Sequence, residues 1–241
     1  MNDNKLRKNI RIFCDFDGTI TIKDFGDEIF KQFGQFEPFH SQLVNKEIKI
    51  IEYWNKIVPT LSGTKESEIE QLALNSDVDP YLEKFIKICS DYKYELSIIS
   101  DGFSSYINPI LKSLRAEKIS VFCNRIDFSG KPKPVFYGAS ESCKCLCASC
   151  KRNVIINNSD DTDIIVFIGD GYSDFCAAEH SDIIFAKKNL AEYCSKNRIP
   201  FYNYKTFFDI NKIFDNLHSG KVQFRKRRQA ELKRKQAYET E

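Results

Sequence analysis

The chain has 241 residues, 42% of them hydrophobic and 29% charged, which fits a globular protein with one large domain or two small ones. Its formal net charge of +2 does not favour nucleic acid or an acidic membrane surface as a general partner. No apolar run approaches the roughly 20 residues that span a bilayer, and the N-terminal residues lack the order of a signal peptide. We therefore expect a cytoplasmic protein with no membrane partner and no nucleic-acid partner. The sequence predicts no oligomeric state.

Short apolar runs predict five buried strands, at residues 10–14, 96–99, 119–123, 164–168 and 183–186. Helical patterns or loops separate these runs. Because alternating strands and helices typically form a parallel sheet covered on both faces, the pattern predicts an α/β fold with a Rossmann-like core. Such sheets bind ligands at the carboxyl ends of their strands.

A long segment separates the first predicted strand from the second. It exceeds any ordinary crossover connection, and its pattern is helix-rich; Ile29, Phe30 and Phe33, for example, share one helical face. We expect residues 22–85 to form a small helical cap that is inserted after the first strand. Residues 1–21 and 86–220 would then form the core.

The C-terminal segment 221–241 differs from the rest of the chain in its charge. It carries eight basic residues against three glutamates. The pattern predicts a solvated helical tail that is basic and frayed or partly disordered. A surface for nucleic acid or for an acidic partner is the alternative.

Four polar stretches lie where apolar runs end or follow them closely. Each alone is compatible with an ordinary turn, because Asp and Gly are common turn residues. Two aspartates as close as Asp15 and Asp17 also repel each other, so a metal ion, a proton or both must compensate. The stretches are Asp15-Phe-Asp17-Gly-Thr19, Ser100-Asp101-Gly102, Lys151 and Gly169-Asp170-Gly171-Tyr-Ser173-Asp174.

Together and in this order, the four stretches resemble the motifs of the haloacid dehalogenase-like (HAD) phosphohydrolase superfamily. The resemblance covers nearly the whole chain, and the helical segment corresponds to the C1 cap of that superfamily. The chain is most similar to the phosphoserine-phosphatase type and, within it, to the methylthiopentenyl-phosphate phosphatase-like group. The stretches that indicate this group are CDFDGTIT, GDGYSD, Phe185-Ala186-Lys187-Lys188 and the cysteine run before Lys151.

The resemblance implies a Mg²⁺-dependent hydrolase that cleaves a small-molecule phosphomonoester through an aspartyl-phosphate intermediate. A phosphotransferase or mutase on the same scaffold is one alternative, because it would share all four motifs. A non-catalytic protein that binds nucleic acid through the cysteine run and the basic tail is the other. All the acids that catalysis needs are present, which favours the enzyme.

The two aspartates of the first stretch have the chemistry for two different roles. A carboxylate such as Asp15 can attack phosphorus and so divide one difficult step into two easier ones. Asp17 can protonate the leaving oxygen and then accept a proton from water. The resemblance implies that Mg²⁺ is held by Asp15, the main-chain carbonyl of Asp17 and Asp170, with Asp174 in support.

The phosphate itself needs donors and positive charge. Ser100, Asp101, Gly102 and Lys151 are the candidate phosphate-binding residues, because a hydroxyl, an ammonium and bare backbone N–H groups can bind phosphoryl oxygens. Asp24, just after the first stretch, is either the N-cap of a helix or a contact to a substrate amine or hydroxyl.

Four cysteines, Cys143, Cys145, Cys147 and Cys150, precede Lys151 within eight residues. They are reduced thiols, ligands of a structural Zn²⁺, or partners in disulfides. Zinc sites usually combine two separated ligand pairs, and here all four cysteines lie on one short stretch. The family resemblance implies a local structural role for this stretch, which would position Lys151.

Overall fold

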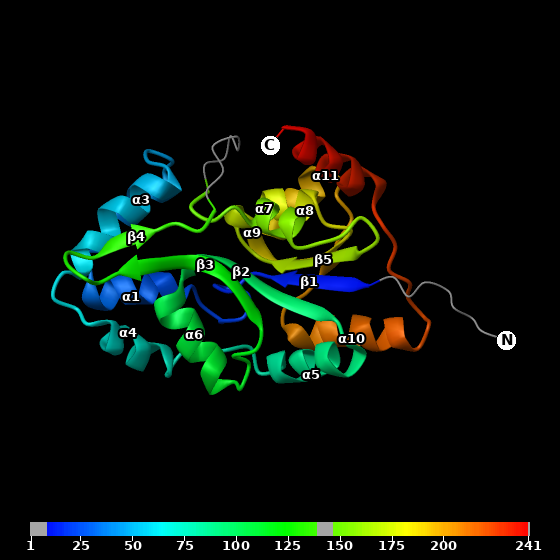
Figure 1. The fold of residues 1–241 in the computed structure, drawn as a ribbon, viewed down its shortest axis with the longest axis horizontal. Helices are drawn as coiled ribbons and strands as arrows, with labels where there is room; N and C mark the ends of the chain where they lie inside the picture. The colour runs from blue at the N-terminus through cyan, green and yellow to red at the C-terminus, as the bar shows by residue number, and fades with distance from the viewer. Residues whose placement is uncertain (1–8, 139–146, 241) are drawn as a thin grey trace. The chain divides into compact units, whose positions relative to one another are not determined.

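The computed structural model describes residues 9–138 and 147–240 (Figure 1). These divide into two compact units. Unit 1 comprises the described residues of Met1–Cys14, Pro80–Ser97 and Ile155–Glu241, and unit 2 those of Asp15–Asp79 and Ile98–Val154. Within the described ranges, no helix is both long enough and apolar enough to cross a membrane.

The described strands form one seven-stranded sheet in the order β4-β3-β2-β1-β5-β6-β7, which confirms the predicted α/β class. Two short strands escaped the sequence pattern. One contains a proline and pairs antiparallel to its neighbour, and the other has two residues, so neither leaves a periodic signal. The strands are β1 (Ile10–Cys14), β2 (Glu95–Phe103), β3 (Ser120–Asp127), β4 (Lys133–Val135), β5 (Ile164–Gly169), β6 (Ile183–Ala186) and β7 (Tyr202–Asn203).

The helices follow the strands along the chain as the sequence pattern indicated. Two single 3₁₀ turns, η1 (Val58–Leu61) and η2 (Tyr172–Asp174), occur among them. The α-helices are α1 (Phe25–Phe33), α2 (Phe39–Val44), α3 (Ile50–Ile57), α4 (Glu66–Ala73), α5 (Leu82–Tyr92), α6 (Ser104–Ser113), α7 (Lys151–Asn157), α8 (Phe175–Glu179), α9 (Lys188–Lys196), α10 (Phe207–His218) and α11 (Arg228–Thr240).

Unit 1 is built on parallel pairing of β1 with β5. The register runs from Ile10↔Ile164 to Cys14↔Ile168, and every residue of β5 is buried. Helices α5 and α10 lie side by side (Figure 1), with the ring of Phe85 5.2 Å from that of Phe207. A strand buried on both faces accounts for the continuous apolar run in the sequence.

Unit 2 joins the helices α1–α4 to β3, to β4 and to the segment that runs from the end of β2 into α6. Helix α4 packs on α6, and the ring of Trp54 on α3 meets that of Phe103 edge-on at 4.8 Å. Phe30 on α1 also packs against Trp54, with 5.8 Å between ring centroids. The helical segment therefore shares a core with the end of β2, which carries the second motif.

The C-terminal segment is not the solvated tail that its charge predicted. Phe224 and Ala230 are buried, and the Arg227 guanidinium donates to the carbonyls of Ala178 and Ser181, both at 2.8 Å, at the end of α8. The last carbonyls of a helix have no partner within it, so a nearby arginine can satisfy them. The basic residues are thus partly used in docking the segment onto unit 1.

Candidate active site

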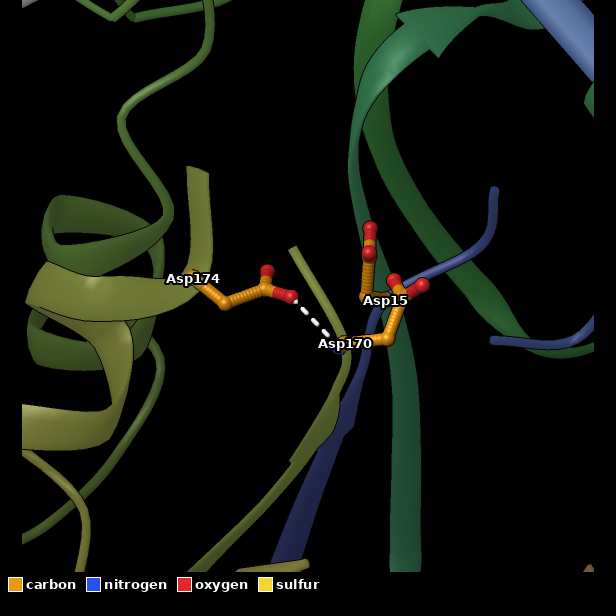
Figure 2. A group of neighbouring side chains, drawn as sticks. All are labelled: Asp15, Asp170 and Asp174. Carbon is orange, nitrogen blue, oxygen red and sulfur yellow. Dashed lines mark hydrogen bonds between the residues drawn. The ribbon is translucent and has the colours of Figure 1, made fainter. Parts of the chain in front are cut away.

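The first and fourth motifs follow two adjacent parallel strands, β1 and β5, and so lie at the same edge of the sheet. Because Cys14 is paired with Ile168, the residues that follow β1 and β5 emerge together. Asp15, Asp170 and Asp174 are buried there, and one carboxylate oxygen from each lies within 4.8 Å of the other two (Figure 2). Three hard oxygen ligands at this spacing fit a divalent cation such as Mg²⁺.

Asp174 shapes the loop that carries Asp170. Its Oδ2 accepts hydrogen bonds from the backbone N–H groups of Asp170, at 2.8 Å, and Gly171, at 2.9 Å; Figure 2 draws the first as a dashed line. Gly169 must be bare, because a Cβ there would lie 2.4 Å from the same oxygen. One oxygen of Asp174 therefore organises the turn.

Lysine ammonium groups offset part of this negative charge. Nζ of Lys151, the first residue of α7, lies 2.6 Å from Oδ1 of Asp15, and both side chains are buried. Nζ of Lys188, the first residue of α9, lies 2.8 Å from Oδ2 of Asp170. Sequence analysis includes Lys188 only as part of the stretch Phe185-Ala186-Lys187-Lys188 and predicts no role for its side chain.

Asp17 is held by two donors. Its Oδ2 accepts a hydrogen bond from the Tyr106 hydroxyl at 2.5 Å, and its Oδ1 accepts one from the backbone N–H of Phe25 at 3.0 Å. Burial, and then the charge of Asp17, raise the pKa of Tyr106 well above its usual value, so the phenol stays protonated and donates. Sequence reasoning missed Tyr106, which resembles any other aromatic residue on a helical face.

The second motif is buried as well. Ser100 accepts a hydrogen bond from the backbone N–H of Gly102 on its Oγ at 2.9 Å. The Asp101 carboxylate accepts one from the backbone N–H of Ser149 at 2.6 Å. Burial raises the pKa of the Asp101 carboxyl, and the charge of Lys151 opposes that shift. The Asp101 side chain thus holds the segment that leads into Lys151.

Asn124 on β3 completes that arrangement. Its Nδ2 donates to the main-chain carbonyl of Asp101 at 2.8 Å, and its Oδ1 accepts from the backbone N–H of Tyr137 at 2.9 Å. Tyr137 precedes the cysteine run, and Ser149 lies within it, next to Cys150. Hydrogen bonds to Asn124 and Asp101 therefore fix the chain before the run and near its end.

Two of the four cysteines in the run, Cys143 and Cys145, lie outside the described residues. Cys147 is half-buried and Cys150 is buried. In the part of the chain that the structure describes, the three aspartates are the one cluster of three or more metal-ligand side chains. Nothing in that part supports a Zn²⁺ site.

Asp24 occupies the N-cap position of α1. Its Oδ1 accepts a hydrogen bond from the backbone N–H of Asp27 at 3.1 Å. This satisfies one of the free N–H groups at the helix start. The capping role is thus present, and the substrate contact stays a prediction.

Comparison with known proteins agrees with the motif resemblance. A model of the family described as Putative Phosphatase matches residues 10–207. A 2-hydroxy-3-keto-5-methylthiopentenyl-1-phosphate phosphatase of Brevibacillus brevis is 28% identical over 222 residues, which cover 90% of this chain and all of that protein. A protein of the same name from Bacillus thuringiensis is 28% identical over 223 residues, which cover 89% of this chain and all of that protein.

Solved structures share the fold. A phospho-aspartyl intermediate analogue of phosphoserine phosphatase superposes with a TM-score of 0.66 at 19% identity, covering 87% of this chain and 99% of that one. A substrate-bound phosphoserine phosphatase also gives a TM-score of 0.66, at 21% identity, with 86% and 99% covered. The HAD-like architecture expected from the motifs is confirmed.

Proposed function

We propose, on the premise that this chain belongs to the Putative Phosphatase family and is a HAD-like phosphomonoester hydrolase, that it cleaves a small phosphorylated metabolite through an aspartyl-phosphate on Asp15. The observation that carries the proposal is the buried carboxylate group of Asp15, Asp170 and Asp174, with the Lys151 ammonium 2.6 Å from Asp15. A nucleophilic carboxylate, oxygen ligands for a cation and a fixed positive charge thus occur together.

The three carboxylates fit Mg²⁺ by their chemistry, since all are oxygen donors and all are buried. Asp15, Asp170 and Asp174 would hold the ion, together with the main-chain carbonyl of Asp17. When bound, Mg²⁺ supplies positive charge that makes the anionic phosphoryl group easier to attack.

The chain's own residues account for the bond changes. An Asp15 oxygen forms a bond to phosphorus while the ester P–O bond breaks, and Asp17 gives its proton to the departing oxygen. Asp17 then takes a proton from water as the water oxygen attacks phosphorus, which releases phosphate and restores Asp15. Lys151 and Ser100 bind phosphoryl oxygens during both steps.

The substrate class follows from the relatives, which are named for 2-hydroxy-3-keto-5-methylthiopentenyl-1-phosphate. We propose that ester or another small phosphomonoester as the substrate. We also propose that residues 22–85 act as the cap that selects it, with Asp24 as a contact, and that residues 1–21 and 86–220 are the catalytic core.

Two variants test the mechanism. Asp15→Asn removes the nucleophile and should abolish turnover. Asp17→Asn keeps the nucleophile, and an activated ester such as p-nitrophenyl phosphate needs little protonation to leave. The Asp17→Asn protein should therefore accumulate phosphorylated Asp15, detected as added mass after an acid quench. Phosphate on another residue, or full turnover by Asp15→Asn, would contradict the assignment.

The phosphotransferase alternative needs a separate measurement, because both reactions pass through the same intermediate. Phosphate release with Mg²⁺ should be ranked by kcat/KM over a panel of small phosphomonoesters, with and without an added alcohol. A hydrolase releases phosphate at the same rate in both cases. A transferase passes the phosphoryl group to the alcohol.

A further inference from the structure

The carboxylate of Asp17 is fixed at both of its oxygens, and the two donors come from different parts of unit 2. Phe25, whose backbone N–H reaches Oδ1 at 3.0 Å, begins α1. Tyr106, whose hydroxyl reaches Oδ2 at 2.5 Å, lies in the first turn of α6. Two donors on two oxygens determine the rotation of the carboxylate plane.

Space around the Tyr106 hydroxyl is arranged for this contact. A Cβ at Gly102 would lie 1.8 Å from the Tyr106 Oη and 2.6 Å from the Asp17 Oδ2. The position thus has to be glycine for the tyrosine and the aspartate to meet. This gives the bare residue of the second motif a role in addition to any approach to phosphate.

The tyrosine ring has no room to turn away. Tyr106 is completely buried, and its ring centroid lies 5.2 Å from that of Phe25 and 6.1 Å from that of Phe16. A buried hydroxyl without a partner is costly, so its hydrogen bond to Asp17 is the favourable arrangement. Burial, and then the negative charges of Asp17 and Asp24, raise the pKa of the Tyr106 phenol, so it stays protonated.

We propose that Tyr106 is a positioning residue for the reaction, which acts by holding the Asp17 carboxylate in the orientation needed for proton transfer. The inference rests on the proposed function. The Tyr106 proton stays on its own oxygen throughout, while Asp17 alone gives and receives the proton that moves. The orientation that Tyr106 holds serves both steps, because the same Asp17 carboxyl group gives a proton to the leaving oxygen and later accepts one from water.

The test is Tyr106→Phe, which removes the hydroxyl and keeps the ring. General acid–base help is worth about 10²–10⁴-fold, so imperfect orientation should lower kcat by about tenfold or more. With p-nitrophenyl phosphate, whose leaving group needs little protonation, a misoriented Asp17 slows mainly the hydrolysis of the intermediate. The steady-state fraction of phosphorylated Asp15 should therefore rise above the wild-type level, and KM should fall together with kcat, so that kcat/KM changes little.

A matched control exists in unit 1. The Tyr193 hydroxyl also donates to a carboxylate, Oε1 of Glu179, at 2.7 Å. Tyr193→Phe removes the same chemical group and should leave kcat, KM and the phosphorylated fraction unchanged. Thermal unfolding of both variants compares their stability.

A second pair of variants separates positioning from general damage. Tyr106→Phe should lower kcat in the wild-type background and have no further effect in Asp17→Asn, since the residue acts through Asp17. An equal loss in both backgrounds would overturn the inference, as would a Tyr106→Phe protein with wild-type kcat and phosphorylated fraction. The inference would likewise be overturned if Tyr106→Phe unfolded the protein both alone and in combination with Asp17→Asn. A wild-type protein that never phosphorylates Asp15 would overturn the proposed function itself.

Discussion

Two lysine–aspartate pairs illustrate how differently the same chemistry can be used. In unit 2, the Lys151 side chain is only 1% exposed and its ammonium lies 2.6 Å from the Asp15 carboxylate. In unit 1, the Lys188 ammonium lies at a similar distance, 2.8 Å, from the Asp170 carboxylate, but its side chain is 54% exposed. The contact distances are alike, and the surroundings of the lysines are not.

Burial decides what each pair contributes. Removing one partner of a buried pair leaves an uncompensated charge and typically costs about 3–5 kcal/mol. An exposed pair is worth about 0–1 kcal/mol, because water and salt screen it. Lys151 is therefore a fixed charge of the site, whereas Lys188 can leave Asp170 at little cost when a cation binds there.

Lys151→Met should have the largest effect and would test the buried pair most directly. We expect kcat/KM to fall by about 10²–10³-fold, as for the loss of one donor to a developing negative charge. The free energy of unfolding should fall by about 3–5 kcal/mol in urea, because Asp15 loses its counter-charge. Lys151→Arg is the control, because it keeps the positive charge but replaces the compact ammonium with a planar guanidinium. Activity within tenfold of wild type in Lys151→Met would show that the pair is not part of the site.

Arg234→Met would separate burial from chemistry. Arg234 donates to the Asp182 carboxylate at 3.2 Å, and their side chains are 9% and 0% exposed. This pair is as buried as the first but belongs to the docked C-terminal segment. We expect unfolding free energy to fall by about 3 kcal/mol, with kcat of the folded protein near wild type. Lys233→Met, which breaks a more exposed pair with Glu179, should cost at most about 1 kcal/mol. Equal losses in the two variants would contradict the role assigned to burial.

Lys188→Met should have the smallest effect. Unfolding free energy should change by no more than about 1 kcal/mol. Mg²⁺ should bind more tightly by up to about fivefold, the equivalent of that energy, because no ammonium competes for Asp170. Calorimetric titration of the protein with Mg²⁺ measures this without relying on activity. Weaker Mg²⁺ binding in the variant would mean that Lys188 supports the metal site instead of competing with it.

The sequence predicted the residues whose signals are local. The apolar run 10–14 predicted a strand at those positions, and Asp15 follows it directly. The strand at 164–168 likewise placed Asp170 just after a sheet edge, and its structure extends one residue further. An apolar run ended by acids is readable from neighbouring residues alone, so the positions of these carboxylates could be anticipated.

Contacts between distant parts of the chain left no such signal. Tyr106 and Asp17 are 89 residues apart, and a tyrosine in a helical pattern is ordinarily part of a core. The charge of the basic segment predicted a solvated tail. The prediction was wrong because the segment's partners, carbonyls and an aspartate, lie about 50 residues earlier in the chain and leave no local signal. Phosphate binding by Asp101 stays a prediction, and the contact of its carboxylate with Ser149 left no signal because only the fold determines the position of Ser149.

The backbone hydrogen bonds that anchor the chain at Tyr137 and Ser149 have a consequence for the tolerance of insertions between these residues. Both backbone N–H groups bind side-chain oxygens of β2 and β3, at Asp101 and Asn124, outside the segment between them. The entropy of closing a loop grows slowly, by about 0.6 kcal/mol for each doubling of its length. Residues inserted between these two points would therefore cost little stability and would leave the anchor that precedes Lys151 in place.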